Sequence, residues 1–141
     1  MRAEPEEFQQ WTGESLRQWG GSLQEEAAAG AKHAAVRPLS NYANDATMLT
    51  YRDADGAPEW HGTQADIFFV QSGSATLVVG GTMVGAETVA PDERRNGVIE
   101  GGERRKLAPG DIVRIPPRVP HQLLLEGSPG VTYFVIKVKN L

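Results

Sequence analysis

The chain has 141 residues, no cysteine, three histidines and a net charge of −4 at pH 7. This length suits one domain with its own core, and the missing thiols exclude disulfides, cysteine nucleophiles and cysteine-ligated metal sites. The mild acidity disfavours binding to nucleic acid. Because the chain has no thiols, any metal site must use imidazole and carboxylate groups.

The N-terminus shows no targeting signal, because it lacks an apolar run of signal-peptide length. No stretch of the chain approaches the ~20 apolar residues of a membrane span. We therefore expect a cytoplasmic protein that binds neither a membrane nor nucleic acid.

Residues 4–30 are predicted to be helical. Acidic residues near the start suit the positive end of a helix dipole, and apolar residues recur at close to helical spacing. Gly20-Gly21 weakens the middle of this segment, so two helices are an alternative to one, and Gly30 is a candidate C-cap. The apolar stripe consists of Phe8, Trp11, Leu16, Trp19 and Leu23.

This stripe has two interpretations. It packs on the body of the protein, which we favour, or it faces a partner helix in a dimer. Both can hold, because two tryptophans on one short helix are a large apolar area for a small protein to cover alone. We expect a homodimer.

From residue 46 onward the hydrophobic period changes to two, with frequent turn residues between short segments. The predicted strands are 46–52, 58–61, 66–72, 74–80, 82–84, 104–107, 111–115, 120–126 and 131–138. Many short strands predict a β-sandwich or barrel, and parallel βαβ units are disfavoured because no helical pattern separates the strands. Residues 85–100 are polar and aperiodic, which predicts a surface loop. We expect a helical extension over residues 1–40 and a β-barrel domain over residues 41–141.

Two of the three histidines lie beside predicted strands. Glu59 and His61 face the same side of a strand, and Asp66 begins the next strand after a short bend. His121 follows a rigid proline-rich turn that enters a strand. Two imidazoles and one or two carboxylates inside a barrel would form a divalent-metal site, which suits Fe(II) best, with Mn, Zn, Ni or Co as alternatives.

Each of these residues also has a simpler interpretation. A single histidine is more often a surface or hydrogen-bonded residue, and Glu59 and Asp66 could lie at a solvated strand end or turn. Their joint placement favours a site. His33 lies outside the pattern, at the end of the helical region, and we expect it to be structural or exposed.

The segment EWHGTQADIFFVQSG, from Glu59 to Gly73, resembles the first motif of the cupin superfamily. That motif has two histidines one residue apart, then an acid, then six residues and a glycine. Asp66 and Gly73 keep the spacing from acid to glycine, and His61 falls on the second histidine.

The segment from Gly110 through Pro116 to His121 resembles the second cupin motif, in which a glycine, a proline and a histidine have this spacing. The two motifs occur in the family's order, each on a predicted strand–turn–strand. The resemblance covers about residues 46–138.

The cupin resemblance implies a mainly β fold, a double-stranded β-helix or jelly-roll barrel, here with an N-terminal helical extension. It also implies a frequent dimer and a divalent metal ion (Fe, Mn, Zn or Ni) inside the barrel. Carried over by position, His61 and His121 are the histidine ligands, Asp66 takes the acid position, and Glu59 stands where the first histidine usually is.

The chain departs from the family pattern at four positions. Glu59 replaces a histidine, and Asp66 is one methylene shorter than the usual glutamate. Arg118 replaces the glycine of the second motif, and Leu125 stands at its asparagine. Glu59 could restore a third ligand of harder, anionic character, which we favour; the alternative is a degenerate site that binds metal weakly or not at all.

The neighbours of these residues indicate a small-molecule cavity. Phe68 and Val70, and likewise Leu123 and Leu125, share a strand face with a candidate ligand, giving a mostly apolar cavity with a small polar cluster. The alternative is that they only fill the core, which we prefer for the leucines. Further candidates for substrate contact, each of which could equally lie on the surface, are Tyr51, Arg52 and Gln122.

Three functions remain open. The first is a metal-dependent enzyme for a small organic molecule, with oxygenase, isomerase and lyase chemistry unresolved because a fold does not select chemistry. The second is a non-catalytic small-molecule or metal-binding barrel, such as a sensor. The third is a metal-free barrel that associates through its N-terminal helix. No phosphate-binding loop or nucleophile elbow supports other classes.

Overall fold

The computed structural model describes residues 5–141, which form one helix and thirteen strands. The expected helix start at residue 4, and residues 1–4 of the expected extension, lie outside the described residues. The elements are α1 (Gly13–Ala29), β1 (Ala34–Asn41), β2 (Asp45–Arg52), β3 (Glu59–His61), β4 (Ala65–Gly73), β5 (Ala75–Val79), β6 (Thr82–Val84), β7 (Glu87–Ala90), β8 (Glu93–Arg95), β9 (Val98–Glu100), β10 (Glu103–Leu107), β11 (Ile112–Ile115), β12 (His121–Leu124) and β13 (Val131–Val138).

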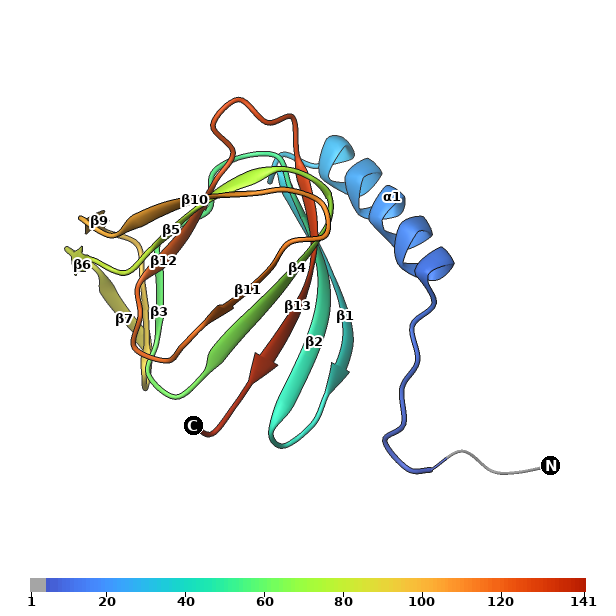
Figure 1. Ribbon diagram of the computed structural model, residues 1–141, viewed down its shortest axis with the longest axis horizontal. Coiled ribbons are helices and arrows are strands. Elements are labelled where there is room, and N and C mark those ends of the chain that lie inside the picture. Colours follow the sequence, from blue (N-terminus) through green and yellow to red (C-terminus); the bar gives the residue numbers. More distant parts are fainter. Residues whose placement is uncertain (1–4) are drawn as a thin grey trace.

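Two antiparallel sheets face each other and form the walls of a barrel (Figure 1). One sheet has the strand order β1-β2-β13-β4-β11, and the other has the order β10-β5-β12-β3-β8-β7. The strands β6 and β9 form a separate pair. The predicted double-sheet β-barrel is therefore confirmed, as is the alternating pattern from residue 46 onward.

The core between the two sheets consists of apolar side chains from both walls. Leu77, Ile115 and Val131 are among the most deeply buried side chains of the described residues. A second apolar cluster joins α1 to the outer face of the sheet that contains β1 and β2. In it, Leu23 and Ala27 of the helix pack with Leu49 of β2. Burial of these two clusters stabilises the barrel and attaches the helix to it.

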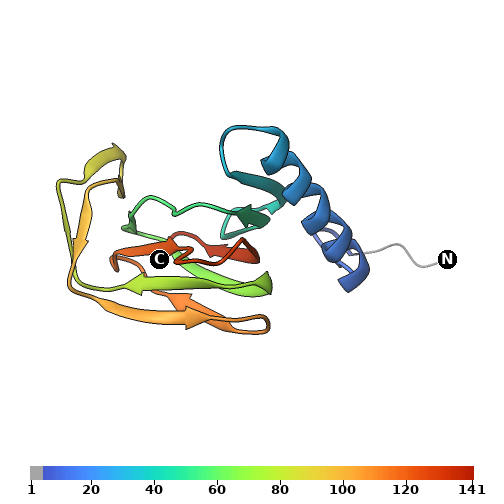
Figure 2. The ribbon, with the colours of Figure 1, turned by 90° about the horizontal axis from the view of Figure 1, so that it is seen from above.

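The helix lies outside the barrel, against β1 and β2 (Figure 2). This placement agrees with the interpretation that the apolar stripe packs on the body of the protein, since Leu16, Trp19 and Leu23 all belong to the second cluster. Among residues 5–141, no helix combines the length and the apolar character that a bilayer span requires.

The predicted start of the helix is wrong, because α1 begins at Gly13. The reason is a cap: the Thr12 hydroxyl oxygen accepts a hydrogen bond from the Ser15 amide at 3.0 Å, which satisfies a free N–H of the first turn. The helix is also continuous through Gly20, which is buried where the helix meets the sheet. A Cβ there would lie 2.9 Å from Gln71 Nε2, so close packing outweighs the low helix propensity of glycine.

The strand β1 lies where the sequence predicts a helical extension up to residue 40, so the extension is not helical over its last residues. It pairs with β2 along its length and forms an edge of the barrel sheet. Pro38 and an irregular register between Pro38 and Ser40 interrupt the pattern, and an edge strand tolerates both.

The surface loop predicted for residues 85–100 is also wrong, because this segment contains β7, β8 and β9. These strands are three or four residues long and mostly exposed. A strand that buries no apolar face shows no hydrophobic alternation, so the sequence pattern could not reveal it. The strand β8 pairs with β3 and so borders the site described next.

Candidate metal centre

Three strands bring the four candidate ligands together. Glu59 and His61 lie at the two ends of β3 on the same face, Asp66 is near the start of β4, and His121 begins β12. The register of the antiparallel pair places His121 directly opposite Glu59. One ligand-capable atom from each of the four residues lies within 4.8 Å of those of the others.

Both imidazoles turn their Nε2 atoms toward the same two carboxylates. His61 Nε2 lies 3.1 Å from Asp66 Oδ2 and 3.8 Å from Glu59 Oε2. His121 Nε2 lies 3.4 Å from Asp66 Oδ2 and 3.6 Å from Glu59 Oε2. His61, Asp66 and His121 are buried, while Glu59 is partly exposed, so the cluster opens to the cavity on the Glu59 side.

The outer nitrogen of each imidazole has its own acceptor. His61 Nδ1 lies 2.6 Å from Glu93 Oε2, and His121 Nδ1 lies 3.1 Å from the Val119 carbonyl oxygen. When Nδ1 donates to these acceptors, the Nε2 lone pair faces the cluster, as in metal-binding histidines. His121 Nε2 is buried and makes no hydrogen bond in the part of the chain that the structure describes.

The outer oxygens of the carboxylates are held by cations and an amide. Arg95 lies 3.0 Å from Glu59 Oε1, and Lys137 Nζ lies 3.4 Å from Asp66 Oδ1. Gln64 Nε2 donates to the same Asp66 oxygen at 3.0 Å. Each carboxylate therefore keeps its other oxygen directed at the imidazoles.

The charges of the cluster shift its proton equilibria. Burial lowers the pKa of His121, but the carboxylates of Asp66 and Glu59, which lie 3.4 and 3.6 Å from Nε2, outweigh it and raise that pKa to about 9. Burial likewise opposes the raised pKa of His61, which Asp66 and Glu93 hold above its usual value. Burial favours neutral carboxyl groups, yet the hydrogen bonds and charges of the imidazoles keep the pKa of Asp66 and of Glu59 below the usual range.

These residues fit a divalent metal ion. Two imidazole nitrogens and two carboxylate oxygens are ligand types that first-row metal ions accept. When Nδ1 of His121 donates to Val119, its Nε2 carries a lone pair that no donor within residues 5–141 uses, and a metal ion would bind that lone pair. Without an ion, protons on the imidazoles occupy the space between the two rings and the acids, and an ion would take the place of these protons. The group of Glu59, His61, Asp66 and His121, of which the last three are buried, could therefore bind a metal.

Sequence reasoning missed two residues that support this centre, Glu93 and Arg95. Both lie on β8, two positions apart and hence on one face, where the register places Glu93 opposite His61 and Arg95 opposite Glu59. The one available sign was their i, i+2 spacing with opposite charges, in a segment expected to be a loop.

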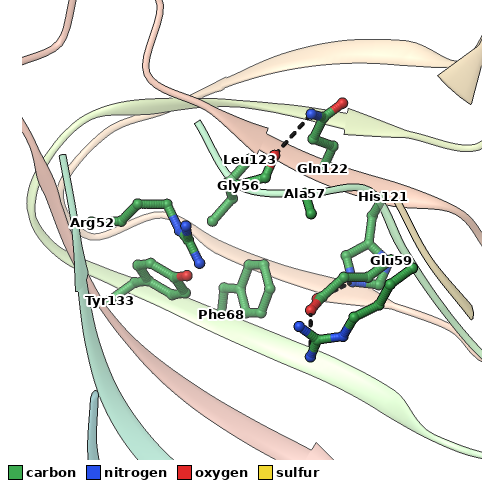
Figure 3. Close-up of a pocket in the computed structure, with 10 residues that line it drawn as sticks. Arg52, Gly56, Ala57, Glu59, Phe68, His121, Gln122, Leu123 and Tyr133 are labelled. Carbon is green, nitrogen blue, oxygen red and sulfur yellow. Dashed lines mark hydrogen bonds and ion pairs between the residues drawn. The ribbon is translucent and has the colours of Figure 1, made fainter. Parts of the chain in front are cut away.

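A cavity of about 200 Å³ lies beside the cluster, inside the barrel (Figure 3). Its lining includes two of the three predicted substrate contacts, Arg52 and Gln122. Gln122 Nε2 donates to the Gly56 carbonyl at 2.8 Å, so its amide is held by the protein. Tyr51 does not line this cavity: it is buried in the cluster beneath the helix, because adjacent residues of β2 face opposite sides of the sheet.

The predicted apolar wall is only partly found. Phe68 and Leu123 line the cavity, and both also belong to the core between the sheets. Val70 and Leu125 are buried in that core and do not line the cavity beside His121. The preferred interpretation of the leucines as core residues agrees with their burial.

Arg118, which replaces the glycine of the second motif, keeps the backbone conformation that glycine favours. Its φ is 63°, in the left-handed region. The Arg118 amide donates to the His61 carbonyl at 2.7 Å, and its guanidinium donates to the Gly62 carbonyl at 2.9 Å. The turn before His121 is thereby attached to the strand that carries His61.

His33 lies outside the centre, as expected. Its side chain is 64% exposed, and Nδ1 lies 2.8 Å from Asp53 Oδ1. It therefore provides a natural control for experiments on the two buried histidines.

No protein-family model matches the chain, and no curated protein matches it in sequence. Solved structures do match. An RmlC-like cupin family protein with a double-stranded β-helix fold, from Methanocaldococcus jannaschii, is 18% identical with a TM-score of 0.55, and the match covers 78% of this chain and 84% of that one. KdgF from a Halomonas species is 15% identical with a TM-score of 0.56, covering 77% and 81%. The DMSP lyase DddQ from Ruegeria pomeroyi is 20% identical with a TM-score of 0.57, covering 81% and 51%.

At such low identities, these matches establish the architecture. The two facing sheets, the converging histidines and acids, and these structural neighbours lead to one conclusion: the chain has the cupin fold, a double-stranded β-helix with an N-terminal helix.

Proposed function

We propose that the protein is a metal-dependent enzyme that acts on a small organic molecule, with one divalent ion held by Glu59, His61, Asp66 and His121. One observation carries the proposal: His121 Nε2 is buried, makes no hydrogen bond within residues 5–141, and faces two carboxylates and a second imidazole. A buried polar atom without a partner is costly unless a ligand satisfies it.

The donor set narrows the choice of ion. Imidazole and carboxylate ligands suit Fe(II), Mn(II), Zn(II) and Ni(II), and the chain has no cysteine to favour a softer ion. Two imidazoles with carboxylates favour Fe(II) among these. The partly exposed Glu59 side of the cluster faces the cavity, which is where a substrate would enter.

A bound ion would supply Lewis acidity toward a substrate oxygen, or activate water or O₂. The protein's own residues fix the site around it. Glu93 orients His61, and Arg95 holds one oxygen of Glu59 so that the other stays directed inward. Phe68 and Leu123 line the adjacent cavity with apolar surface, which limits the access of water to bound substrate.

The structural neighbours support an enzyme without selecting its reaction. DddQ is described as a DMSP lyase, so the same fold carries chemistry on a small organic molecule in that protein. Oxygenase, isomerase and lyase reactions are all compatible with an ion beside a cavity of this size.

A non-catalytic or metal-free binding barrel is the second candidate, and one observation favours it. The four residues already compensate one another, since His61 Nε2 lies 3.1 Å from Asp66 and the pKa of both imidazoles is raised. A cluster that is neutralised by its own protons can persist without an ion.

Elemental analysis of untagged protein separates the two candidates. We expect about one equivalent of metal in the wild type and in His33→Ala, whose imidazole is exposed and remote, and almost none in His121→Ala. No bound metal after incubation with Fe(II), Mn(II), Zn(II) and Ni(II) would contradict the proposal. Metal that His121→Ala loses, with no turnover of any tested substrate, would favour a non-catalytic barrel.

A further inference from the structure

Arg52 lies across the cavity from the candidate metal centre. Figure 3 shows Arg52 and Tyr133 at one end, Glu59 and His121 at the other, and the Phe68 ring between them. Arg52 is the last residue of β2, and its side chain enters the cavity while that of its neighbour Tyr51 packs beneath the helix. A ligand in this cavity would therefore contact both ends.

The Arg52 guanidinium has no anionic partner among residues 5–141. Its Nε is buried without a hydrogen bond, and none of the ion pairs in that part of the chain includes Arg52. The acids nearest in sequence are used elsewhere: Asp53 pairs with His33, and Asp55 accepts a hydrogen bond from the Leu125 amide. Arg52 is partly buried, and a buried N–H donor such as its Nε is unfavourable unless a ligand accepts a hydrogen bond from it.

The other two cations near the cluster have anionic partners, unlike Arg52. Arg95 pairs with Glu59, and Lys137 pairs with Asp66. The polar group that Arg52 meets inside the cavity is the Tyr133 hydroxyl, and burial raises the pKa of Tyr133, so this group is a neutral phenol. The positive charge of Arg52 is therefore directed into the cavity and is not neutralised by an anion there.

The total charge of the site also favours the binding of an anion. Three carboxylates match three cations around the cluster and cavity, so a divalent ion would leave an excess of positive charge there. The carboxylates are Glu59, Asp66 and Glu93, and the cations are Arg52, Arg95 and Lys137. A site with this excess attracts an anion.

We infer that the cavity binds a small carboxylic acid, whose carboxylate pairs with Arg52 and whose apolar body lies over Phe68 toward the metal centre. The planar guanidinium can direct Nε and one Nη at the two oxygens of a carboxylate. The volume of about 200 Å³ suits a small ligand. The inference rests on the proposed function for the ligand's role as substrate, since it names the substrate class of that site.

The test follows the Arg52 Nε–Hε resonance by NMR while propionate, or its uncharged analogue propionamide, is titrated into metal-free and Zn(II)-loaded protein. We expect propionate to shift this resonance and to bind at least about tenfold more tightly than propionamide. Arg52→Gln should weaken propionate binding at least about tenfold, and Arg52→Lys, which keeps the charge without the fork, should fall between. Arg105→Gln is the matched control, because Arg105 is exposed and pairs with Glu103 outside the cavity.

The outcomes separate this inference from the proposed function. Equal propionate affinity in loaded wild type and Arg52→Gln would overturn the inference and leave the metal centre intact. A propionate-dependent shift at Arg52 in a protein that takes up no metal would support the carboxylate site and contradict the metal enzyme. Tighter binding of inorganic phosphate than of propionate would overturn the assignment to a carboxylate.

Discussion

Glu59 and His121 face each other directly across the pair of strands β3 and β12, with 3.6 Å between Glu59 Oε2 and His121 Nε2. On the other side of β3, the register places Arg95 opposite Glu59, and its guanidinium lies 3.0 Å from Glu59 Oε1. Glu59 is therefore the middle of a row across three strands. The position that is histidine in the cupin motif is here an anion with its own cation.

This row predicts the effect of restoring the histidine. In Glu59→His, the guanidinium of Arg95 would lose its anionic partner. Its positive charge would then lie beside the new imidazole and repel the metal ion that this imidazole has to bind. We expect Glu59→His to bind Zn(II) at least about tenfold more weakly than the wild type. Adding Arg95→Gln should recover most of the loss, which a competition titration with a chelating dye can measure as a double-mutant cycle. Tighter binding by Glu59→His alone would contradict this account.

Glu93 is predicted to tune the centre through His61. Its carboxylate, 2.6 Å from His61 Nδ1, fixes the ring with Nε2 inward. Glu93→Ala should lower metal affinity roughly 10- to 100-fold, as for other residues that orient a ligating histidine. Glu87→Ala is the control, because Glu87 is an exposed residue on the neighbouring strand β7. If the two variants lose affinity equally, an orienting role for Glu93 is wrong.

The sequence predicted the part of the site that depends on local geometry. The two-residue period of a strand places Glu59 and His61 on one face, and the structure has them so. The distance between β3 and β12 is not a local property, and it could be anticipated only through the resemblance of both motifs to one family.

The rest of the site was hidden for physical reasons. Glu93 and Arg95 reach the centre because a short, mostly exposed strand pairs with β3, and such a strand leaves no hydrophobic pattern. The sequence could not show which of Tyr51 and Arg52 faces the cavity. Neither face of β2 is open to solvent, because one faces the barrel interior and the other lies beneath the helix. Alternation separates the two faces without saying which one faces the cavity.

Metal binding is predicted to depend on pH through His121, whose pKa the acids raise to about 9 in the absence of an ion. At pH 7 its imidazole is therefore protonated, and the proton must leave when Nε2 binds a metal. Affinity should accordingly rise as the pH increases toward about 9 and then level off. Calorimetry of Zn(II) binding at pH 7 in buffers of different ionisation enthalpy should show proton release. An enthalpy that is the same in every buffer would exclude it.

Arg118 is predicted to combine a strained backbone with a useful side chain. Its φ of 63° costs about 1 kcal/mol for a residue with a Cβ, while its hydrogen bond to the Gly62 carbonyl contributes about 1 kcal/mol. Arg118→Ala keeps the strain and loses the bond, whereas Arg118→Gly loses both. We expect Arg118→Gly to be close to wild type and Arg118→Ala to be about 1 kcal/mol less stable by urea denaturation. The reverse order would mean that the side chain acts in another way.

The glycines of the two motifs are predicted to differ in how strictly they are required. Both have positive φ, 75° at Gly73 and 91° at Gly110. A Cβ at Gly73 would lie 2.0 Å from the Gly130 carbonyl oxygen, whereas one at Gly110 would meet nothing within 4 Å. Gly110→Ala therefore tests backbone strain alone, and Gly73→Ala tests strain together with a clash between two backbone segments.

We expect Gly110→Ala to lower the free energy of unfolding by about 1 kcal/mol, the cost of left-handed backbone for a residue with a Cβ. Gly73→Ala should lower it by about 3 kcal/mol or more, because overpacking adds to that strain and the contacting atom belongs to the backbone, which cannot rotate away. Urea denaturation of both variants measures the difference. Equal losses would show that the junction between Gly73 and Gly130 opens readily, and that the end of β4 is held less firmly than its pairing with β13 suggests.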